Sequence, residues 1–244
     1  MVCHWNCTRF RMSIFKFKQF EVDQTGCAMK INTDGVLIGA MADHQHPKRI
    51  LDIGTGTGVI ALMLAQRFPD AHIHAVEIDE QAAETAERNF KQSPFNHRLT
   101  ISNAAIEYYK SPDRFDLIVS NPPFFVNDLK NEEVRKGIAR HAAEGFFSML
   151  VAKISELLTD EGQVWLILPI KQAEEVVMQA GHYGMELMES IYVHSDRSKT
   201  AFRQMICLGK NRTALQESDF YLYEDLKVHT AEYKILLKDF FLAF

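Results

Sequence analysis

The sequence predicts an α/β protein with a doubly wound, mostly parallel seven-stranded sheet that includes a C-terminal antiparallel hairpin. From position 49 onwards, short apolar runs of strand length alternate with longer runs of helical period, which is typical of a parallel sheet covered by helices. The first run leads into a glycine-rich turn. No linker rich in Gly, Ser or Pro divides the 244 residues. We therefore expect a disordered extension at 1–11 and one domain at 12–244, with an N-terminal arm at 12–48.

The arm is expected to contribute a strand and a helix. Residues 14–22 alternate apolar and polar side chains, as a strand or extended arm does. Residues 29–40 combine a polar turn with an apolar helix start, which Thr33 or Asp34 would cap.

The alternating region and the tail supply the other elements. Strands are predicted near 49–54, 72–78, 99–103, 115–120 and 163–168. Helices are predicted near 57–67, 80–91, 145–159 and 171–180. The β-rich runs 187–194 and 201–209 suit an antiparallel hairpin, and the aromatic tail at 217–244 is expected to pack back on the domain.

Composition restricts the class of protein. A formal net charge of −5 is not that of a protein that coats nucleic acid, so any such contact must come from local patches. There is no run of about eighteen apolar residues and no signal peptide, which predicts a soluble, cytoplasmic protein without a membrane partner. The four cysteines form no repeated CxxC pair, so we expect reduced thiols and no metal. We also expect a monomer.

The glycine-rich turn predicts a small-molecule site. It contains Gly54, Gly56 and Gly58, which let the backbone turn sharply and let a ligand approach closely. The dinucleotide fingerprint has glycine at its first, third and sixth places, and the sixth place counted from Gly54 is Val59. Asp52, at the end of the strand, would repel a pyrophosphate but attract the amine of a methionine moiety. These features disfavour NAD.

The next strand adds an acidic residue to the same site. Glu77 can accept hydrogen bonds from both ribose hydroxyls of a nucleoside. Together with Asp52 and the three glycines, it fits S-adenosylmethionine. The alternative is that the acidic residues after this strand, Asp79 and Glu80, merely cap the following helix.

A second motif, Asn121-Pro122-Pro123-Phe124, directly follows the predicted strand at 115–120. Two prolines end a strand and stiffen the backbone around Asn121. The Asn121 side-chain oxygen and the Pro122 backbone oxygen could accept both hydrogens of a planar amino group, which localises the nitrogen lone pair for attack. Phe124 would stack on the acceptor ring. We predict that these four residues form the catalytic loop, although the motif also occurs as an ordinary strand stop.

Topology joins the two motifs. In an open parallel sheet, ligands bind beyond the carboxyl ends of the strands, at the switch in strand order. The strands that end at Asp52 and at Asn121 flank that point, so Asn121 is expected to border both the cofactor methyl group and the acceptor nitrogen.

Basic residues form three groups that are candidates for RNA contact, although each group is also compatible with an ordinary solvated face. The candidates are Lys16 and Lys18; Lys130, Arg135, Lys136 and Arg140; and Arg197, Lys199, Arg203, Lys210 and Arg212.

The glycine turn and the Asn-Pro-Pro-Phe loop resemble those of class I methyltransferases, which have a Rossmann-like fold. From Phe15 onwards, including Phe17–Phe20, Met29–Lys30 and Thr33–Gly35, the chain is similar to the bacterial tRNA(Val) (adenine-37-N6)-methyltransferase family. The resemblance implies S-adenosylmethionine as cofactor and an anticodon-loop adenine of tRNA as substrate.

The resemblance also implies additional cofactor contacts. It places Lys30 to Asp34 near the cofactor, so Lys30 and Thr33 join the expected cofactor-binding residues. Methyltransferases of this type often carry Asp at the position of Asn103, which would accept a hydrogen bond from the adenine amino group of the cofactor. An Asn oxygen can accept the same bond, or Asn103 could cap a helix.

Other acceptors stay open as alternatives. A protein glutamine amide is one, because release-factor methyltransferases use the same motif; they usually have Tyr at the position of Phe124 and an added N-terminal helical domain. Adenine N6 in rRNA or DNA is another. A non-catalytic cofactor-binding protein is disfavoured by the complete Asn121–Phe124 motif.

Overall fold

The computed structural model describes residues 14–25, 27, 30–123, 132–211 and 213–244, and for 132–144 it describes the helix but not the side chains. The predicted extension at 1–11 lies outside these residues.

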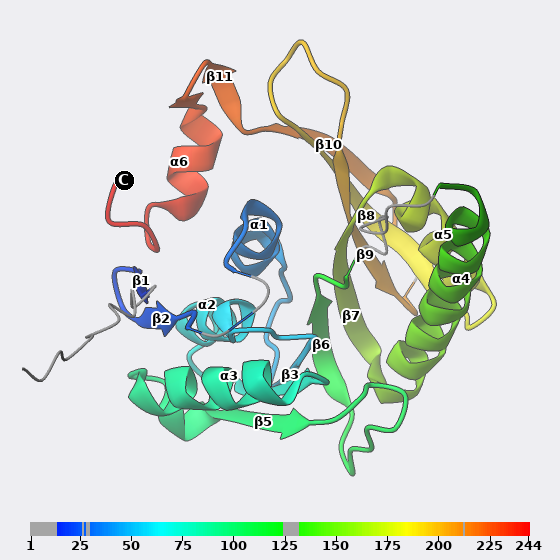
Figure 1. Ribbon diagram of the computed structural model, residues 1–244, viewed down its shortest axis with the longest axis horizontal. Helices are drawn as coiled ribbons and strands as arrows, with labels where there is room; N and C mark the ends of the chain where they lie inside the picture. Colours follow the sequence, from blue (N-terminus) through cyan, green and yellow to red (C-terminus); the bar gives the residue numbers. More distant parts are fainter. Residues whose placement is uncertain (1–13, 26, 28–29, 124–131, 212) are drawn as a thin grey trace, which may run out of the picture.

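An eight-stranded sheet runs through the molecule (Figure 1). Its strands are β3 (Arg49–Ile53), β4 (His72–Glu77), β5 (Leu99–Asn103), β6 (Phe115–Ser120), β7 (Leu158–Leu168), β8 (Glu186–His194), β9 (Arg203–Gly209) and β10 (Gln216–Tyr221). The spatial order is β10-β8-β9-β7-β6-β3-β4-β5, and β9 alone runs antiparallel to its neighbours in this sheet. The predicted α/β class and the β8–β9 hairpin are confirmed.

The strand count of seven was wrong, because β10 adds an eighth strand. β10 lies in the tail and pairs in parallel with β8, so the hairpin is not at the edge of the sheet. The sequence of β10 begins Gln-Glu-Ser-Asp and has no apolar alternation. Its pairing with β8 therefore determines its strand conformation more than its own side chains do.

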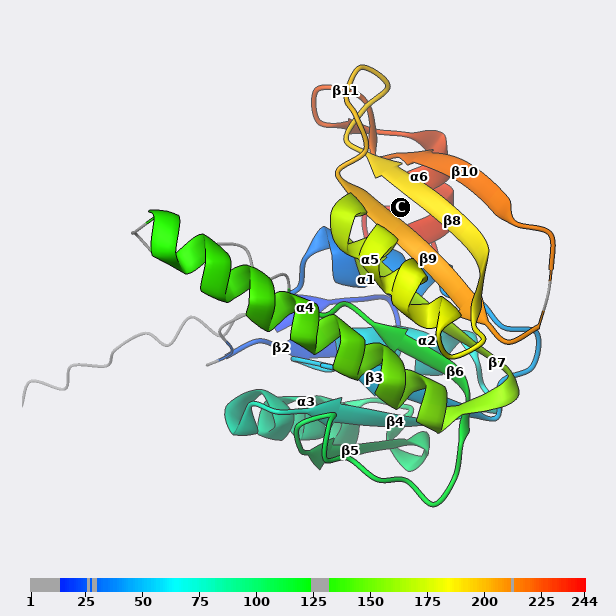
Figure 2. The same ribbon diagram turned by 90° about the vertical axis from the view of Figure 1, so that its right-hand side faces the viewer.

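Helices cover both faces of the sheet (Figures 1 and 2). The helices are α1 (Thr33–Met41), α2 (Val59–Arg67), α3 (Glu80–Gln92), α4 (Glu132–Leu157), α5 (Ile170–Gly181) and α6 (Ala231–Leu237), with a short 3₁₀ turn at Asn96–Arg98. One core packs under α1, α2, α3 and α6, and the other under α4 and α5. Side chains of a strand alternate between them: Leu117 and Val119 enter the first core and Ile118 the second.

Two expectations about helices were wrong in detail. α4 begins at Glu132 and not near 145. The prediction missed its first turns because they carry charged residues in place of an apolar stripe. The cap of α1 is neither Thr33 nor Asp34: the side chain of Asn32 accepts a hydrogen bond from the backbone N–H of Gly35 at 2.8 Å.

The N-terminal arm forms a hairpin, whereas the sequence predicted a single strand or an extended arm. β1 (Ile14–Lys16) pairs antiparallel with β2 (Glu21–Asp23), and the chain turns between Phe17 and Phe20, whose rings stack with centroids 4.4 Å apart. The hairpin packs against the C-terminal segment through a bridge from Phe17 to Phe241. Before α6, β11 (Tyr223–Asp225) and β12 (Val228–His229) form another small hairpin. The tail therefore packs back on the domain.

None of the helices in the described part of the chain has the length and apolar character needed to cross a membrane.

Candidate active site

The carboxyl ends of β3, β4 and β6 meet at one edge of the sheet, because these strands are parallel neighbours. A cavity of about 280 Å³ lies there, and Gly54, Glu77, Asn121, Pro122 and Pro123 are among the residues that line it. Small-molecule sites occupy about 300–1,000 Å³, so the cavity is close to the lower end of that range. Residues predicted to bind the cofactor and residues predicted to bind the reacting amine therefore share one cavity.

The glycine-rich loop needs its glycines for conformation. Gly54, Gly56 and Gly58 have φ values of 72°, 56° and 85°, a left-handed region that other residues rarely adopt. Gly58 also packs closely, because a methyl group built there would lie 2.5 Å from Cε1 of Phe90. The loop is tied to β4 by the N–H of Gly56, which donates to Oε2 of Glu77 at 2.8 Å.

Asp52 is fully buried beneath this loop and is not among the residues lining the cavity. Its Oδ2 accepts hydrogen bonds from Oγ1 of Thr55 at 2.5 Å and from the N–H of Ala61 at 3.1 Å. Within the described residues its Oδ1 has no hydrogen-bond partner. Burial raises the pKa of Asp52 to about 7. An acceptor left unpaired here fits a ligand ammonium, met directly or through water.

The raised pKa of Asp52 makes a prediction for stability. Because the folded-state pKa lies above the unfolded value, the stabilising effect of protonation is complete below about pH 4 and is lost as the pH rises through about 7. We expect Asp52→Asn to remove this loss. Its free energy of unfolding, compared with that of wild type, should therefore be larger at pH 8 than at pH 5 by on the order of a few kcal/mol. Urea unfolding at pH 5 and pH 8 measures it.

The control for this experiment is Asp70→Asn, which changes an exposed carboxylate. Wild type and Asp70→Asn should lose the same free energy of unfolding between the two pH values. If Asp52→Asn lost as much free energy of unfolding between pH 5 and pH 8 as wild type and Asp70→Asn do, Asp52 would not be the group responsible for the pH dependence.

Glu77 and Asn103 lie at the ends of the neighbouring strands β4 and β5. Oε2 of Glu77 accepts from the Gly56 N–H and Oε1 from the Asp79 N–H at 2.9 Å, so the carboxylate is fixed at the cavity wall with lone pairs remaining on both oxygens. Nδ2 of Asn103 donates to the backbone oxygens of Glu77 and Ile78 at 2.9 and 3.2 Å. The side-chain oxygen of Asn103 is thereby left to accept a hydrogen bond. A turn and not a helix follows Asn103, so Asn103 does not cap a helix. Asp79, in contrast, caps α3.

Asn121 follows the buried end of β6. The hydroxyl of Ser120 donates to the backbone oxygen of Ile53 at 2.8 Å, which fixes the start of the loop against β3. Oδ1 of Asn121 is buried and has no hydrogen-bond partner among the residues described. Leaving a buried acceptor unpaired costs about 1–3 kcal/mol, so the site fits a ligand that brings a donor. Phe124 lies outside the described residues.

The N-terminal arm is joined to the glycine loop by a residue of α3. Lys30 and Thr33 are exposed, precede and begin α1, and do not line the cavity. Sequence reasoning missed Asn89 of α3, which is 1% exposed. Its Oδ1 accepts from the Asp23 N–H at 2.9 Å, and its Nδ2 donates to the oxygens of Asp23 and Thr57 at 3.0 and 2.8 Å. Asn89 thereby joins the arm to the glycine loop, and its only sequence signal was a polar residue on the apolar face of a helix.

Three lysines of the first and third basic groups make other contacts. Lys16 pairs with Glu21 at 2.9 Å, and the ammonium of Lys18 donates to the backbone oxygens of Lys238 and of Phe244, the latter at 2.7 Å. Lys210 pairs with Asp160 at 3.2 Å. Their assignment to RNA stays a prediction.

Other members of the third group, and the helix that carries most of the second group, lie toward the carboxyl edge of the sheet. The loop with Arg197 and Lys199 follows β8, which runs parallel to the strands of the cavity, and Arg203 begins β9 at the same edge. Figure 2 shows the first turns of α4 projecting beyond the sheet. The side chains of Arg135, Lys136 and Arg140 on those turns, and Lys130 and Arg212, lie outside what is described.

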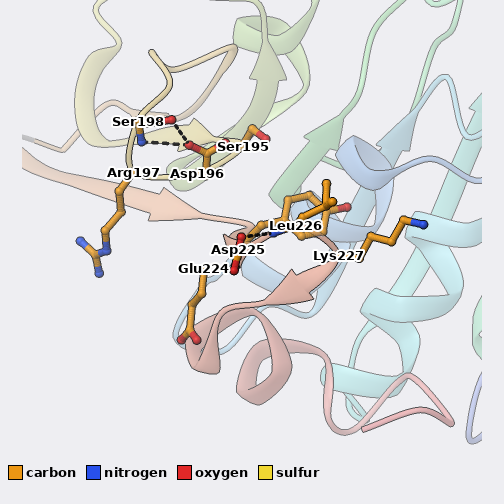
Figure 3. A pocket seen from close by; sticks show the side chains of 9 residues that line it. Ser195, Asp196, Arg197, Ser198, Glu224, Asp225, Leu226 and Lys227 are labelled. Carbon is orange, nitrogen blue, oxygen red and sulfur yellow. Dashed lines mark hydrogen bonds between the residues drawn. The ribbon is translucent and has the colours of Figure 1, made fainter.

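A separate cavity of about 630 Å³ lies between the Ser195–Ser198 loop and the turn at Tyr223–Lys227 (Figure 3). Asp196 accepts hydrogen bonds from Ser198 there. Its lining mixes cations with carboxylates, including Glu224, so its charge favours neither an anionic nor a cationic ligand.

The chain is similar to known proteins over nearly all its length. The methyltransferase small domain family model matches residues 31–190. A tRNA1(Val) (adenine(37)-N6)-methyltransferase of Pedobacter heparinus is 54% identical over 230 residues, covering 94% of this chain and 98% of the relative. One of Dyadobacter fermentans with the same name is 40% identical, covering 96% and 99%.

Solved structures agree on the fold. A structure described as a predicted O-methyltransferase of Agrobacterium tumefaciens has a TM-score of 0.66 at 21% identity, covering 85% of this chain and 96% of that chain. The predicted cofactor is confirmed: S-adenosylmethionine is the methyl donor. The chain belongs to the tRNA1(Val) (adenine(37)-N6)-methyltransferase family, within the methyltransferases of the small-domain type.

Proposed function

We propose that this protein transfers the methyl group of S-adenosylmethionine to N6 of adenine 37 in tRNA1(Val). The observation that carries the proposal is the buried Oδ1 of Asn121, which has no hydrogen-bond partner among the described residues and lies in a cavity that Glu77 also lines. The names of the full-length relatives support the choice of nucleotide.

The residues of the chain divide the work between binding and chemistry. Glu77 would accept hydrogen bonds from the ribose hydroxyls, Asn103 would accept one from the adenine amino group of the cofactor, and Asp52 would meet the methionine ammonium directly or through water. When bound, S-adenosylmethionine supplies an electrophilic methyl group on its sulfonium.

Asn121 and Pro122 act on the target amine. The side-chain oxygen of Asn121 and the backbone oxygen of Pro122 accept its two hydrogens, so its lone pair is localised and directed into the cavity. With the cofactor bound, this lone pair would receive the methyl carbon as the bond from carbon to sulfur breaks, and the proton would then leave the methylated nitrogen to water. No protein base is needed for that step, because methylation makes the proton acidic.

The target adenine must leave its stack to enter the cavity, and single-stranded loops permit this at low cost. We propose that the RNA lies along the carboxyl edge of the sheet, between the first turns of α4 and the Arg197–Lys199 loop. A monomer acting on tRNA in the cytoplasm fits this arrangement.

Transfer from labelled cofactor tests the proposal. The protein is incubated separately with total tRNA, ribosomal RNA, DNA and release factor, and the products are digested to nucleosides or amino acids. We expect label as N6-methyladenosine from tRNA, and its loss from a tRNA1(Val) transcript with guanine at position 37. Label in N5-methylglutamine would replace the proposal with the protein-directed reaction, and label only in ribosomal RNA or DNA would exclude the tRNA substrate.

A further inference from the structure

An ion pair joins two segments far apart in the sequence. Nε of Arg203, the first residue of β9, donates to Oδ2 of Asp34 at 2.7 Å, and the two side chains are 25% and 10% exposed. Asp34 lies in the first turn of α1, where the helix dipole also favours a carboxylate. Nη1 of Arg203 donates to the backbone oxygen of Phe202 at 2.9 Å. The guanidinium that sequence reasoning assigned to RNA is thus engaged with α1 and with its own loop.

The first turn of α1 lies against Asn121. Asn32 caps this turn, and a methyl group built at Gly35 would lie 3.4 Å from Oδ1 of Asn32 and 3.9 Å from Nδ2 of Asn121. The opposite end of α1 is tied to α2 by hydrogen bonds from Arg67 to backbone oxygens. The ion pair therefore ties the end of α1 that faces the catalytic loop, and just before that end the N–H of Ile31 donates to Oε1 of Gln24 at 2.7 Å.

We infer that Arg203 and Asp34 are positioning residues that hold the first turn of α1 against the amide of Asn121 and so aim its side-chain oxygen. The inference rests on the proposed function, in which that oxygen accepts a hydrogen of the target amine. A misplacement of about 1 Å at a reacting group can lower a rate about 100-fold. Loss of the ion pair therefore acts on kcat, whereas loss of a phosphate contact would act on KM.

A double-mutant cycle tests the inference. Asp34→Asn, Arg203→Gln and the double variant are compared with wild type for kcat, KM for tRNA and the salt dependence of KM. We expect each single variant to lower kcat about 10-fold or more, with KM and its salt dependence unchanged. The double variant should be no slower than either single variant, because the two residues act as one unit.

Arg197→Gln is the matched control from the same loop. The Arg197 guanidinium lies over the ring of Tyr221 at 4.8 Å, and among the described residues it pairs with no carboxylate. Its side chain is among those that line the neighbouring cavity (Figure 3). Arg197→Gln is expected to raise KM for tRNA and to lower the slope of log KM against log salt by about one unit.

Two outcomes would overturn the inference. A raised KM with a shallower salt slope in Arg203→Gln, together with a silent Asp34→Asn, would make Arg203 a phosphate contact. If both single variants had the kcat of wild type, the ion pair would have only a structural role. If Asp34→Asn does not fold, Arg203→Lys replaces it: a lysine cannot reproduce the planar Nε contact, so kcat should fall at unchanged KM, and wild-type kcat would refute the inference.

The proposed substrate is judged separately. Wild type is assayed first, and absence of transfer to tRNA would exclude the proposed substrate. The variant-to-wild-type ratios would then be measured on the amine that wild type does methylate, and they decide the inference in the same way.

Discussion

Asn121→Ala is expected to lower kcat by about 10²–10³, the loss seen when one preorganised polar group that stabilises a transition state is removed. Its Oδ1 is buried and unpartnered among the described residues, so alanine costs the folded protein little while removing an acceptor that the transition state needs. Affinity for S-adenosylmethionine should stay within a few-fold of wild type. Single-turnover rates at saturating cofactor, with calorimetry for binding, measure both quantities.

Asn103→Ala is the matched control for Asn121→Ala, because it truncates an Asn at the carboxyl end of another parallel strand of the same sheet, β5. Loss of its hydrogen bonds should weaken cofactor binding by about 1–2 kcal/mol and leave the single-turnover rate at saturating cofactor near that of wild type. If Asn121→Ala keeps most of its turnover, Asn121 only ends the strand and the mechanism above is wrong.

Gly58→Ala is expected to have the largest effect on stability, a loss of about 2–5 kcal/mol. Two costs add: about 1–2 kcal/mol for a left-handed backbone with a side chain, and about 1–3 kcal/mol for a methyl group forced against a packed neighbour. The neighbour is the ring of Phe90, which lies 2.5 Å from the position of that methyl group. Urea unfolding of the cofactor-free protein measures the loss.

Gly184→Ala separates the two costs. Gly184 has φ of 69°, but a methyl group built there meets nothing within 4 Å. It should therefore lose only about 1–2 kcal/mol. Equal losses for the two variants would show that Phe90 moves aside at little cost and that only backbone conformation requires Gly58.

Local patterns explain why much of the fold could be predicted. The strands β3 and β6 are short, mainly apolar runs, and β4 and β5 alternate apolar and polar residues, so each strand carries its own signal. The same holds for the two motifs of the site, because the glycines and the prolines impose their backbone conformations locally.

What could not be predicted depends on contacts between distant residues. β10 has polar residues and becomes a strand by pairing with β8. The turn of the arm at Phe17–Phe20 places the ring of Phe17 against that of Phe241 and the ring of Phe20 against that of Phe95, and both partners are distant in the sequence. The Asp34–Arg203 pair and the three hydrogen bonds of Asn89 join residues that no periodicity relates. Asp52 was correctly placed at the end of a strand, but its full burial depends on how the glycine loop folds over it.

β10 also bears on how copies of this protein behave toward one another. It forms one edge of the main sheet, and an edge strand presents unpaired backbone groups on which a strand of another molecule can add. Glu217 and Asp219 lie on β10, so pairing between two copies of this edge would bring carboxylates together. Without β10, the edge would be β8, where Ile191 and Val193 are buried apolar residues. The carboxylates of the edge strand therefore disfavour pairing between two copies of the sheet at this edge.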